Sequence, residues 1–334
     1  MFITGASGML GTHLAYNLLK KSEDVTALKR TTTDLSSMKN IFAYYEDGDN
    51  SLFNKIEWVE GDILDFYLID ELIAKHKQVY HTAAFVSFHK QDHDKIRDIN
   101  IRGTENIVAA CIKNKSRLVY VSSIAALGRS ENNTDLRESD FRDSSYKSSV
   151  YSESKFLAEQ EVWRGIAEGL DAVIINPSVI IGPGDWNKSS AQLFKTVANG
   201  LKFYTSGTNG YIDVRDIAEI MHKLMKSNVS AERFILSAEN VSYKRLFETI
   251  AKELHLTPPK ILANKFLSEL SWRALGLWSF ITKSSPLITK ETARSANTHY
   301  AYSSQKIIDT LNYNFISFDD SVKHTANMYD KLTN

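Results

Sequence analysis

TGASGMLG, residues 4–11, follows the short apolar run MFI and opens a stretch with helical apolar spacing. Its glycines, Gly5, Gly8 and Gly11, stand three residues apart. Between a strand and a helix, the first glycine permits a tight turn, the second lets backbone amides approach a pyrophosphate, and the third allows close packing of helix on sheet. The first helical turn adds free N–H groups and the positive end of the helix dipole. This stretch therefore predicts a dinucleotide-binding turn.

Short β-branched runs alternate with helical patterns through the first half of the chain. Strands are expected in MFIT, DVTALKR, KIEWVEGD, KQVYHTAA, SRLVYVSS and DAVIINPSVIIG (171–182), with a long helix from about Asp94 and another from Tyr151. Such alternation is typical of βαβ units. It predicts an α/β fold with a doubly wound parallel sheet of the Rossmann type.

The pattern changes at about Gly182, where loops lengthen and clean βα units become rare. We expect a smaller, mostly helical substrate-binding domain from there on. RFILSA, residues 233–238, is strand-like and is a candidate to rejoin the main sheet. The predicted division is therefore a dinucleotide-binding domain of residues 1–180 with about 211–237, and a substrate-binding domain of 181–210 with 238–334.

The 334 residues carry 40 basic and 40 acidic side chains, so no net field favours nucleic acid as a partner. The single cysteine, Cys111, cannot form an intramolecular disulfide and fits a reducing compartment. The N-terminus lacks the basic leader of a signal peptide, and we expect a cytoplasmic location. The most apolar stretch, residues 266–288, is interrupted by Glu269, Arg273 and Lys283. We expect an amphipathic helix there and no membrane span, with contact to a membrane surface as the alternative.

The second expected strand ends in TALKRTTTD, residues 26–34. An acidic residue at this tip would bind the adenosine ribose of NAD, but Lys29 and Arg30 stand here. Cations suit the 2′-phosphate of NADP. The sequence therefore favours NADP over NAD, the alternative being a merely solvated basic end of a strand.

YSESK, residues 151–155, places Tyr151 and Lys155 on one face of a helix. An ammonium beside a phenol favours the phenolate, and a bound oxidised nicotinamide would add a second positive charge. Together they can poise the tyrosine to exchange a proton with a carbonyl oxygen near neutral pH. The strand end VYVSS lies upstream and offers the hydroxyls of Ser122 and Ser123 at the same edge of the sheet.

With these motifs the chain resembles the extended short-chain dehydrogenases/reductases, also called the NAD(P)-dependent epimerase/dehydratase superfamily. The resemblance covers nearly the whole chain and rests on TGASGMLG, Asp62-Ile63, His81 to Ala84, Asn100, Ser123, YSESK and NPSVIIGPGD. It implies that Tyr151 is the acid/base and that Lys155 binds the nicotinamide ribose and lowers the pKa of the tyrosine. Ser123 would hold the substrate oxygen because it lies five residues before Gly128, as in the family, with Ser122 as the second choice.

The glycine turn, the strand ends and this resemblance together predict the cofactor-binding set. Asn100 is expected on the cofactor side of the pocket, and Pro177 and Ser178 beside the nicotinamide amide. The full set is Gly5, Ser7, Gly8, Met9, Leu10, Gly11, Lys29, Arg30, Asp62, Ile63, Thr82, Ala83, Ala84, Asn100, Ser122, Tyr151, Lys155, Pro177 and Ser178.

Departures from the family pattern argue against two of the family's reactions. The residues after Ser123 are Ile-Ala-Ala, not the Asp-Glu pair of sugar 4,6-dehydratases. NGYIDV has Asn209 where nucleotide-sugar epimerases usually carry an arginine for the diphosphate, and Arg215 lies six residues later. FVSFH (85–89) and the Trp-rich stretch 266–281 are apolar and aromatic, which resembles the dihydroflavonol-reductase and 3β-hydroxysteroid-dehydrogenase branch, unless these aromatics only fill a core.

We therefore expect an NADP-preferring oxidoreductase that interconverts a small hydrophobic carbonyl compound and its alcohol. Two alternatives stay open: an NAD-dependent sugar or nucleotide-sugar epimerase, and a cofactor-sensing protein without turnover. The sequence predicts no metal site, and the family suggests a homodimer through helices near 94–114 and 151–168. The expected substrate contacts are Phe85, Val86, Ser87 and Ser149.

Overall fold

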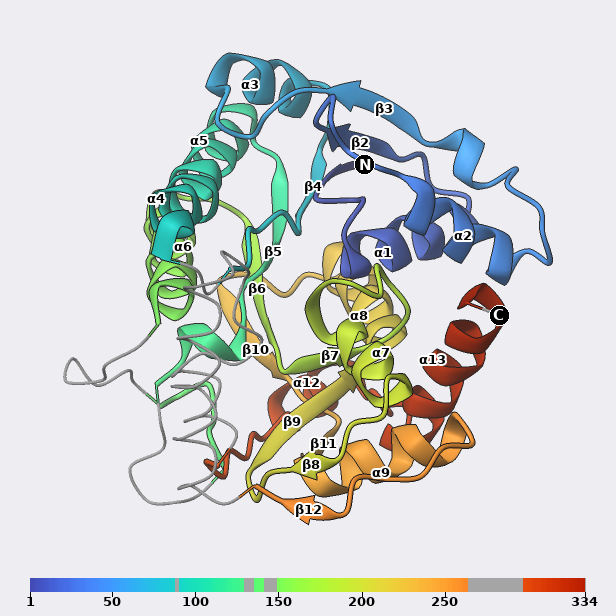
Figure 1. Cartoon of the computed structure of the whole chain (residues 1–334). Coiled ribbons are helices and arrows are strands. Elements are labelled where there is room, and N and C mark those ends of the chain that lie inside the picture. The colour runs from blue at the N-terminus through green and yellow to red at the C-terminus, as the bar shows by residue number, and fades with distance from the viewer. Residues whose placement is uncertain (88–89, 129–134, 141–148, 264–296, 334) are drawn as a thin grey trace.

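The computed structural model describes residues 1–87, 90–128, 135–140, 149–263 and 297–333. Its centre is a seven-stranded sheet in the order β10-β6-β5-β4-β1-β2-β3, with every neighbouring pair parallel (Figure 1). The strands are β1 Phe2–Thr4, β2 Thr26–Lys29, β3 Glu57–Glu60, β4 Gln78–His81, β5 Arg117–Val121, β6 Ala172–Pro177 and β10 Glu232–Leu236. The predicted α/β Rossmann-type fold is confirmed. The strand order reverses between β1 and β4, and a crevice for a dinucleotide opens at the carboxyl ends of the strands at such a point.

Helices cover both faces of this sheet (Figure 1). On one face α1 Met9–Lys20, α2 Ser36–Tyr45 and α8 Val214–Lys226 contribute to one buried apolar cluster. On the other face α3 Phe66–Ala74, α5 Gly103–Asn114 and α6 Val150–Ala167 contribute to a second. The long helix expected from about Asp94 is a run of α4 His93–Arg97, a π-helical turn at Asp98–Arg102 and α5.

A smaller unit packs beside the carboxyl edge of the main sheet. Its three-stranded sheet, β11-β9-β7, consists of β7 Val179–Ile181, β9 Thr208–Asp213 and β11 Glu239–Ser242. Helices α7 Gln192–Ala198, α9 Tyr243–Glu253 and α13 Phe318–Thr333 share its apolar core. The remaining elements are β8 Phe203–Tyr204 paired with β12 Ile261–Leu262, α12 Gln305–Leu311, and the short helices η1 Phe53–Lys55, η2 Lys90–Asp92, η4 Ile124–Ala126 and η5 Ser189–Ala191.

The prediction of a single strand over 171–182 is wrong. It is two strands in different sheets, β6 and β7, separated at Ser178, whose N–H donates to the Leu236 carbonyl of β10 at 2.9 Å. The strand-like residues 233–238 do return to the main sheet, as β10 beside β6. The division into two domains stays a prediction, and β9, partly assigned to the first domain, pairs within the small sheet.

No helix in the described part of the chain is long and apolar enough to cross a membrane. The amphipathic helix expected at 266–288 lies outside the described residues.

Candidate active site

The turn after β1 has the geometry that the glycine spacing predicts. Gly5 adopts φ +75°, and a Cβ there would lie 2.6 Å from the Ala83 nitrogen. A Cβ on Gly11 would lie 2.1 Å from the Gly5 carbonyl oxygen, so helix and turn touch backbone to backbone. The Gly8 N–H donates to that same oxygen at 3.0 Å and closes the turn.

The start of α1 suits an anionic ligand. Among the described residues no side chain caps Gly8, and the first turn contains no acidic residue. Gly8 is exposed and Ser7 is partly exposed, whereas Leu10 is buried and can offer only its backbone. Met9 lies against Gly184 of the loop after β7. These features fit the pyrophosphate of a nicotinamide dinucleotide.

The other predicted cofactor residues follow the strands of the same sheet edge. Lys29 ends β2, Asp62 and Ile63 follow β3, Thr82 to Ala84 follow β4, and Pro177 ends β6. The carboxyl ends of parallel strands share one edge, so the structure brings these segments together. The Thr82 hydroxyl donates to the Thr4 carbonyl at 2.7 Å, and this bond joins the β4 loop to the glycine turn.

The two cations at the end of β2 differ in their surroundings. Lys29 Nζ lies 2.6 Å from Glu60 Oε1 of the neighbouring strand. Arg30 is exposed, and within the described residues it forms no ion pair. Arg30 is therefore the cation at this tip whose charge is not already matched by a carboxylate.

Asn100 joins the loop after β4 to α6. Its Oδ1 accepts the Phe85 N–H at 2.7 Å, and its Nδ2 donates to the Phe85 carbonyl at 3.1 Å and to Ser154 Oγ at 2.9 Å. Ser154 Oγ in turn donates to the Tyr151 carbonyl at 2.8 Å. Asn100 is buried within the π-helical turn, and its contacts with Phe85 place it against the loop that follows β4.

The three predicted catalytic residues meet beyond the end of β5. Ser123 follows that strand, while Tyr151 and Lys155 lie one turn apart on α6. The Ser123 side chain lies close enough to the Tyr151 phenol to lower its pKa. Lys155 is buried, and its Nζ donates to the Val121 carbonyl at 2.8 Å and to the Tyr120 hydroxyl at 3.2 Å.

Burial shifts both predicted catalytic groups away from their charged forms. It raises the pKa of Tyr151, against a smaller lowering by the hydrogen bond with Ser123. It lowers the pKa of Lys155 to about 8, against a raising by the Glu159 carboxylate. At neutral pH the phenol therefore holds its proton, as a proton donor must, and the lysine remains mostly charged.

Ser122 and Ser178 have contrasting surroundings. The Ser122 hydroxyl is buried and donates to Glu159 Oε2 at 2.6 Å, so Ser123 is the serine whose side chain meets Tyr151. Ser178 Oγ is buried, and no described residue makes a hydrogen bond to it. An unpaired buried hydroxyl at this sheet edge fits a ligand that supplies the missing partner.

The expected substrate contacts lie in the loop after β4 and at the start of α6. Lys95 Nζ lies 4.6 Å from the centre of the Phe85 ring, and Val86 is 49% exposed. Ser87 donates to Asp92 at 2.6 Å, and Ser149 caps α6 by accepting the Ser152 N–H at 3.0 Å. His89 and the Trp-rich stretch 266–281 lie outside the described residues. The roles of all these residues stay predictions.

The two positions that could hold a nucleotide-sugar diphosphate are engaged elsewhere. Asn209 Oδ1 accepts the N–H of Gly210 at 2.9 Å, and its Nδ2 lies 3.5 Å from the Tyr243 hydroxyl. Arg215 forms a two-pronged ion pair with buried Asp213, Nε to Oδ1 at 2.9 Å and Nη2 to Oδ2 at 2.6 Å. This fork uses two of the five N–H groups of the guanidinium and pairs its charge with that of Asp213.

Sequence reasoning missed buried Glu159 and partly buried Arg233, which form an ion pair behind the predicted catalytic residues. Glu159 lies four residues after Lys155, so helical spacing alone could have placed it on the same face. Nothing local marks Arg233, because its contact depends on β10 lying next to β6.

Comparison with known proteins agrees with this arrangement. Residues 1–236 match the sequence model described as "NAD dependent epimerase/dehydratase family". The chain is 29% identical over 266 residues to "Putative dihydroflavonol 4-reductase" of Synechocystis sp., covering 78% of this chain and 74% of that protein. It is 29% identical over 253 residues to cinnamoyl-CoA reductase 1 of Petunia hybrida, covering 72% and 73%. The crystal structure of gox2253 shares the fold, with a TM-score of 0.82 at 24% identity over 99% of this chain and 98% of that one.

Proposed function

The chain belongs to the NAD dependent epimerase/dehydratase family, and from that premise we propose that it is an NADPH-preferring reductase of small hydrophobic carbonyl compounds. The observation that carries the proposal is the meeting of Ser123, Tyr151 and Lys155 beyond the end of β5. Relatives at 29% identity that are named as reductases support reduction as the reaction.

The residues of this chain would divide the work as follows. The dinucleotide, when bound, supplies the hydride. Tyr151 donates its phenolic proton to the carbonyl oxygen as negative charge develops there, and Ser123 donates a hydrogen bond to the same oxygen. Charged Lys155 one turn away stabilises the phenolate that remains on Tyr151. The glycine turn of residues 5–11 and the start of α1 would hold the pyrophosphate.

The engagement of Asn209 and Arg215 supports a substrate without a diphosphate. Arg215 is already paired with Asp213, and Asn209 has no positive charge to offer. Partly exposed Val86 and Phe85 offer apolar surface in the loop after β4 instead. A hydrophobic aldehyde or ketone therefore suits this surface better than a nucleotide sugar.

The test is transfer of deuterium from NADPH labelled at nicotinamide C4 to a panel of aromatic and alicyclic carbonyl compounds. The proposal predicts that deuterium appears on the carbinol carbon of the alcohol formed, as measured by mass spectrometry. Interconversion of sugar stereoisomers with no net oxidation of added NADPH would favour the epimerase alternative. Firm binding of the dinucleotide with no turnover of either class would favour a sensing protein.

Replacing Arg30 with serine is expected to weaken NADPH binding at least about 10-fold, since a charge-assisted hydrogen bond contributes roughly 1.5–3 kcal/mol. NADH binding should change little, because NADH has no 2′-phosphate. Fluorescence titration with both dinucleotides gives the two affinities. Lys75→Ser, at an exposed lysine of α3's end, serves as the control. An equal loss for both dinucleotides, or no loss, would contradict the assignment of NADP specificity to Arg30.

A cytoplasmic location and a homodimer through the helices near 94–114 and 151–168 stay predictions. In the structure α5 and α6 pack beside each other on one face of the sheet, which supports their use as a joint surface. The mass of the protein in solution would test the dimer.

A further inference from the structure

Glu159 is a buried carboxylate on the catalytic helix, only 2% exposed and one turn beyond Lys155. Four donors from three strand regions and from its own helix surround it. They are Ser122 Oγ at 2.6 Å, Asn176 Nδ2 at 2.8 Å, Arg233 Nη1 at 3.1 Å and Trp163 Nε1 at 3.4 Å. Burial of a carboxylate is tolerated when such donors and a cation satisfy it.

Two of these donors bracket Ser123. Ser122 precedes it in the chain, and Asn176 Nδ2 also donates to the Ser123 carbonyl at 3.0 Å. Glu159 thus fixes Ser122, which precedes Ser123, and the Asn176 amide, which is bonded to the Ser123 carbonyl. Through these two bonds the Glu159 carboxylate holds the end of β5 against β6, next to Ser123.

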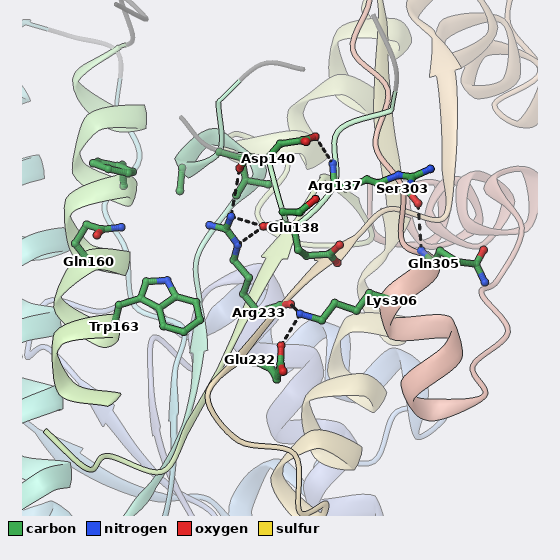
Figure 2. Close-up of a pocket in the computed structure, with 14 residues that line it drawn as sticks. Arg137, Glu138, Asp140, Gln160, Trp163, Glu232, Arg233, Ser303, Gln305 and Lys306 are labelled. Atoms are coloured by element: carbon green, nitrogen blue, oxygen red, sulfur yellow. Dashed lines mark hydrogen bonds and ion pairs between the residues drawn. The ribbon is translucent and has the colours of Figure 1, made fainter. Parts of the chain in front are cut away.

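Arg233 connects Glu159 to residues 137–140, which precede α6 in the chain. Figure 2 shows its guanidinium reaching from β10 to the 137–140 segment, across a cavity of about 850 Å³ whose other wall includes Gln160 and Trp163 of α6. Its Nε donates to the Glu138 carbonyl at 3.1 Å and its Nη2 to the Asp140 carbonyl at 3.4 Å. Glu138 Oε1 accepts the Ile235 N–H at 2.8 Å, which secures the same segment to β10.

The charges around Lys155 come from a few elements. Tyr120 of β5 offers a neutral hydroxyl, because burial raises its pKa. His81 of β4 is neutral at physiological pH, because burial lowers its pKa to about 3. Tyr151 on α6 is neutral at physiological pH, because burial raises its pKa. Among the described residues, Glu159 is the anion that acts on the lysine, and Arg233 balances it from the far side.

We propose that Glu159 is a positioning residue for the carbonyl chemistry, which fixes Ser123 through Ser122 and Asn176 and places a negative charge beside the ammonium of Lys155. The proposal rests on the proposed function for its catalytic meaning, but the charge relation is a property of the protein alone. Burial lowers the pKa of Lys155 to about 8, and Glu159 acts against that lowering. Without the carboxylate, more of the lysine loses its proton near neutral pH.

Glu159→Gln removes this charge while keeping the size of the side chain. The titration midpoint of Lys155, followed by NMR on protein with ¹³C-labelled lysine and assigned by its absence in Lys155→Met, should fall by about one pH unit. The basic limb of the kcat profile should move to lower pH with it. Glu161→Gln, at a surface carboxylate paired with Arg164 on the same helix, should move neither.

Glu159→Asp separates the two roles, because it keeps the charge and shortens the reach towards Ser122. It should leave the Lys155 midpoint nearly in place and lower kcat about 10-fold at every pH, with KM changed less. Full activity in Glu159→Asp would refute the positioning of Ser123. An unmoved midpoint in Glu159→Gln, with kcat lowered equally at all pH values, would refute the charge role.

A double variant and a readout that does not need activity complete the test. If Glu159→Gln does not fold, Glu159→Gln combined with Arg233→Met removes both partners of the ion pair, so that Arg233 is not left as an unpaired cation, and it should still lower the midpoint. If the unaltered protein reduces no carbonyl compound, the proposed function fails. The NMR midpoint still decides whether Glu159 governs the charge of Lys155.

Discussion

Replacing Tyr151 with phenylalanine is expected to lower kcat for carbonyl reduction by about 10²–10⁴-fold, the range typical for loss of a general acid. The phenol is the group on which the Ser123 side chain acts, and burial keeps it protonated at neutral pH by raising its pKa. Phenylalanine fills the same volume but has no proton to give. Single-turnover kinetics with NADPH would measure the hydride step without interference from product release.

The same variant should bind NADPH with nearly unchanged affinity, because the glycine turn and Lys155 are intact. Tyr67→Phe, at a tyrosine 85% exposed on α3, is the matched control and should leave kcat unaltered. A Tyr151→Phe protein that turns over at the normal rate would refute the assignment of the acid.

Gly11→Ala is expected to destabilise the fold and to weaken dinucleotide binding strongly. A Cβ at this position would lie 2.1 Å from the Gly5 carbonyl oxygen and 2.6 Å from the Ala6 Cα. Both neighbours are backbone atoms of the turn itself, so the helix and the turn must separate to admit a methyl group. Overpacking of this kind typically costs about 1–3 kcal/mol of folding free energy. Thermal unfolding and NADPH titration measure the two effects.

Gly8→Ala is the matched comparison for this prediction. Its added Cβ would lie 3.3 Å from the Gly5 carbonyl oxygen and would point to an exposed position. It should therefore keep nearly the normal melting temperature while weakening NADPH, since the methyl group would stand where the pyrophosphate approaches. Equal melting temperatures and equal NADPH affinities for Gly11→Ala and the unaltered protein would refute the role given to the turn.

Local patterns in the sequence were enough to predict the main sheet and its dinucleotide turn. The glycine spacing of residues 5–11 and the alternation of strands with helices act over short distances, and the structure keeps both. The split of 171–182 into β6 and β7 could not be predicted in the same way. It depends on β10 and β9, which lie more than 25 residues later and pair with the two halves separately.

In the candidate site, too, some features follow from local sequence patterns and others depend on residues far apart in the chain. The spacing of Tyr151 and Lys155 on one helix is visible in the sequence, and so are the two cations at the end of β2. The pairing of Lys29 with Glu60 follows from the register of β2 on β3, which the sequence does not display. The Glu159–Arg233 pair likewise joins residues far apart in the chain, so only the folded sheet reveals it.

The most direct test of the central claim is the state of the nucleotide in freshly purified protein. The protein is denatured, any released nucleotide is identified, and exchange of the bound molecule with added NADPH is measured. A reductase must release its oxidised cofactor after each turnover, so the account predicts protein that is empty or exchanges readily, and that prefers NADPH. Stoichiometric NAD that does not exchange would mean a closed redox cycle and would replace the reductase with an epimerase.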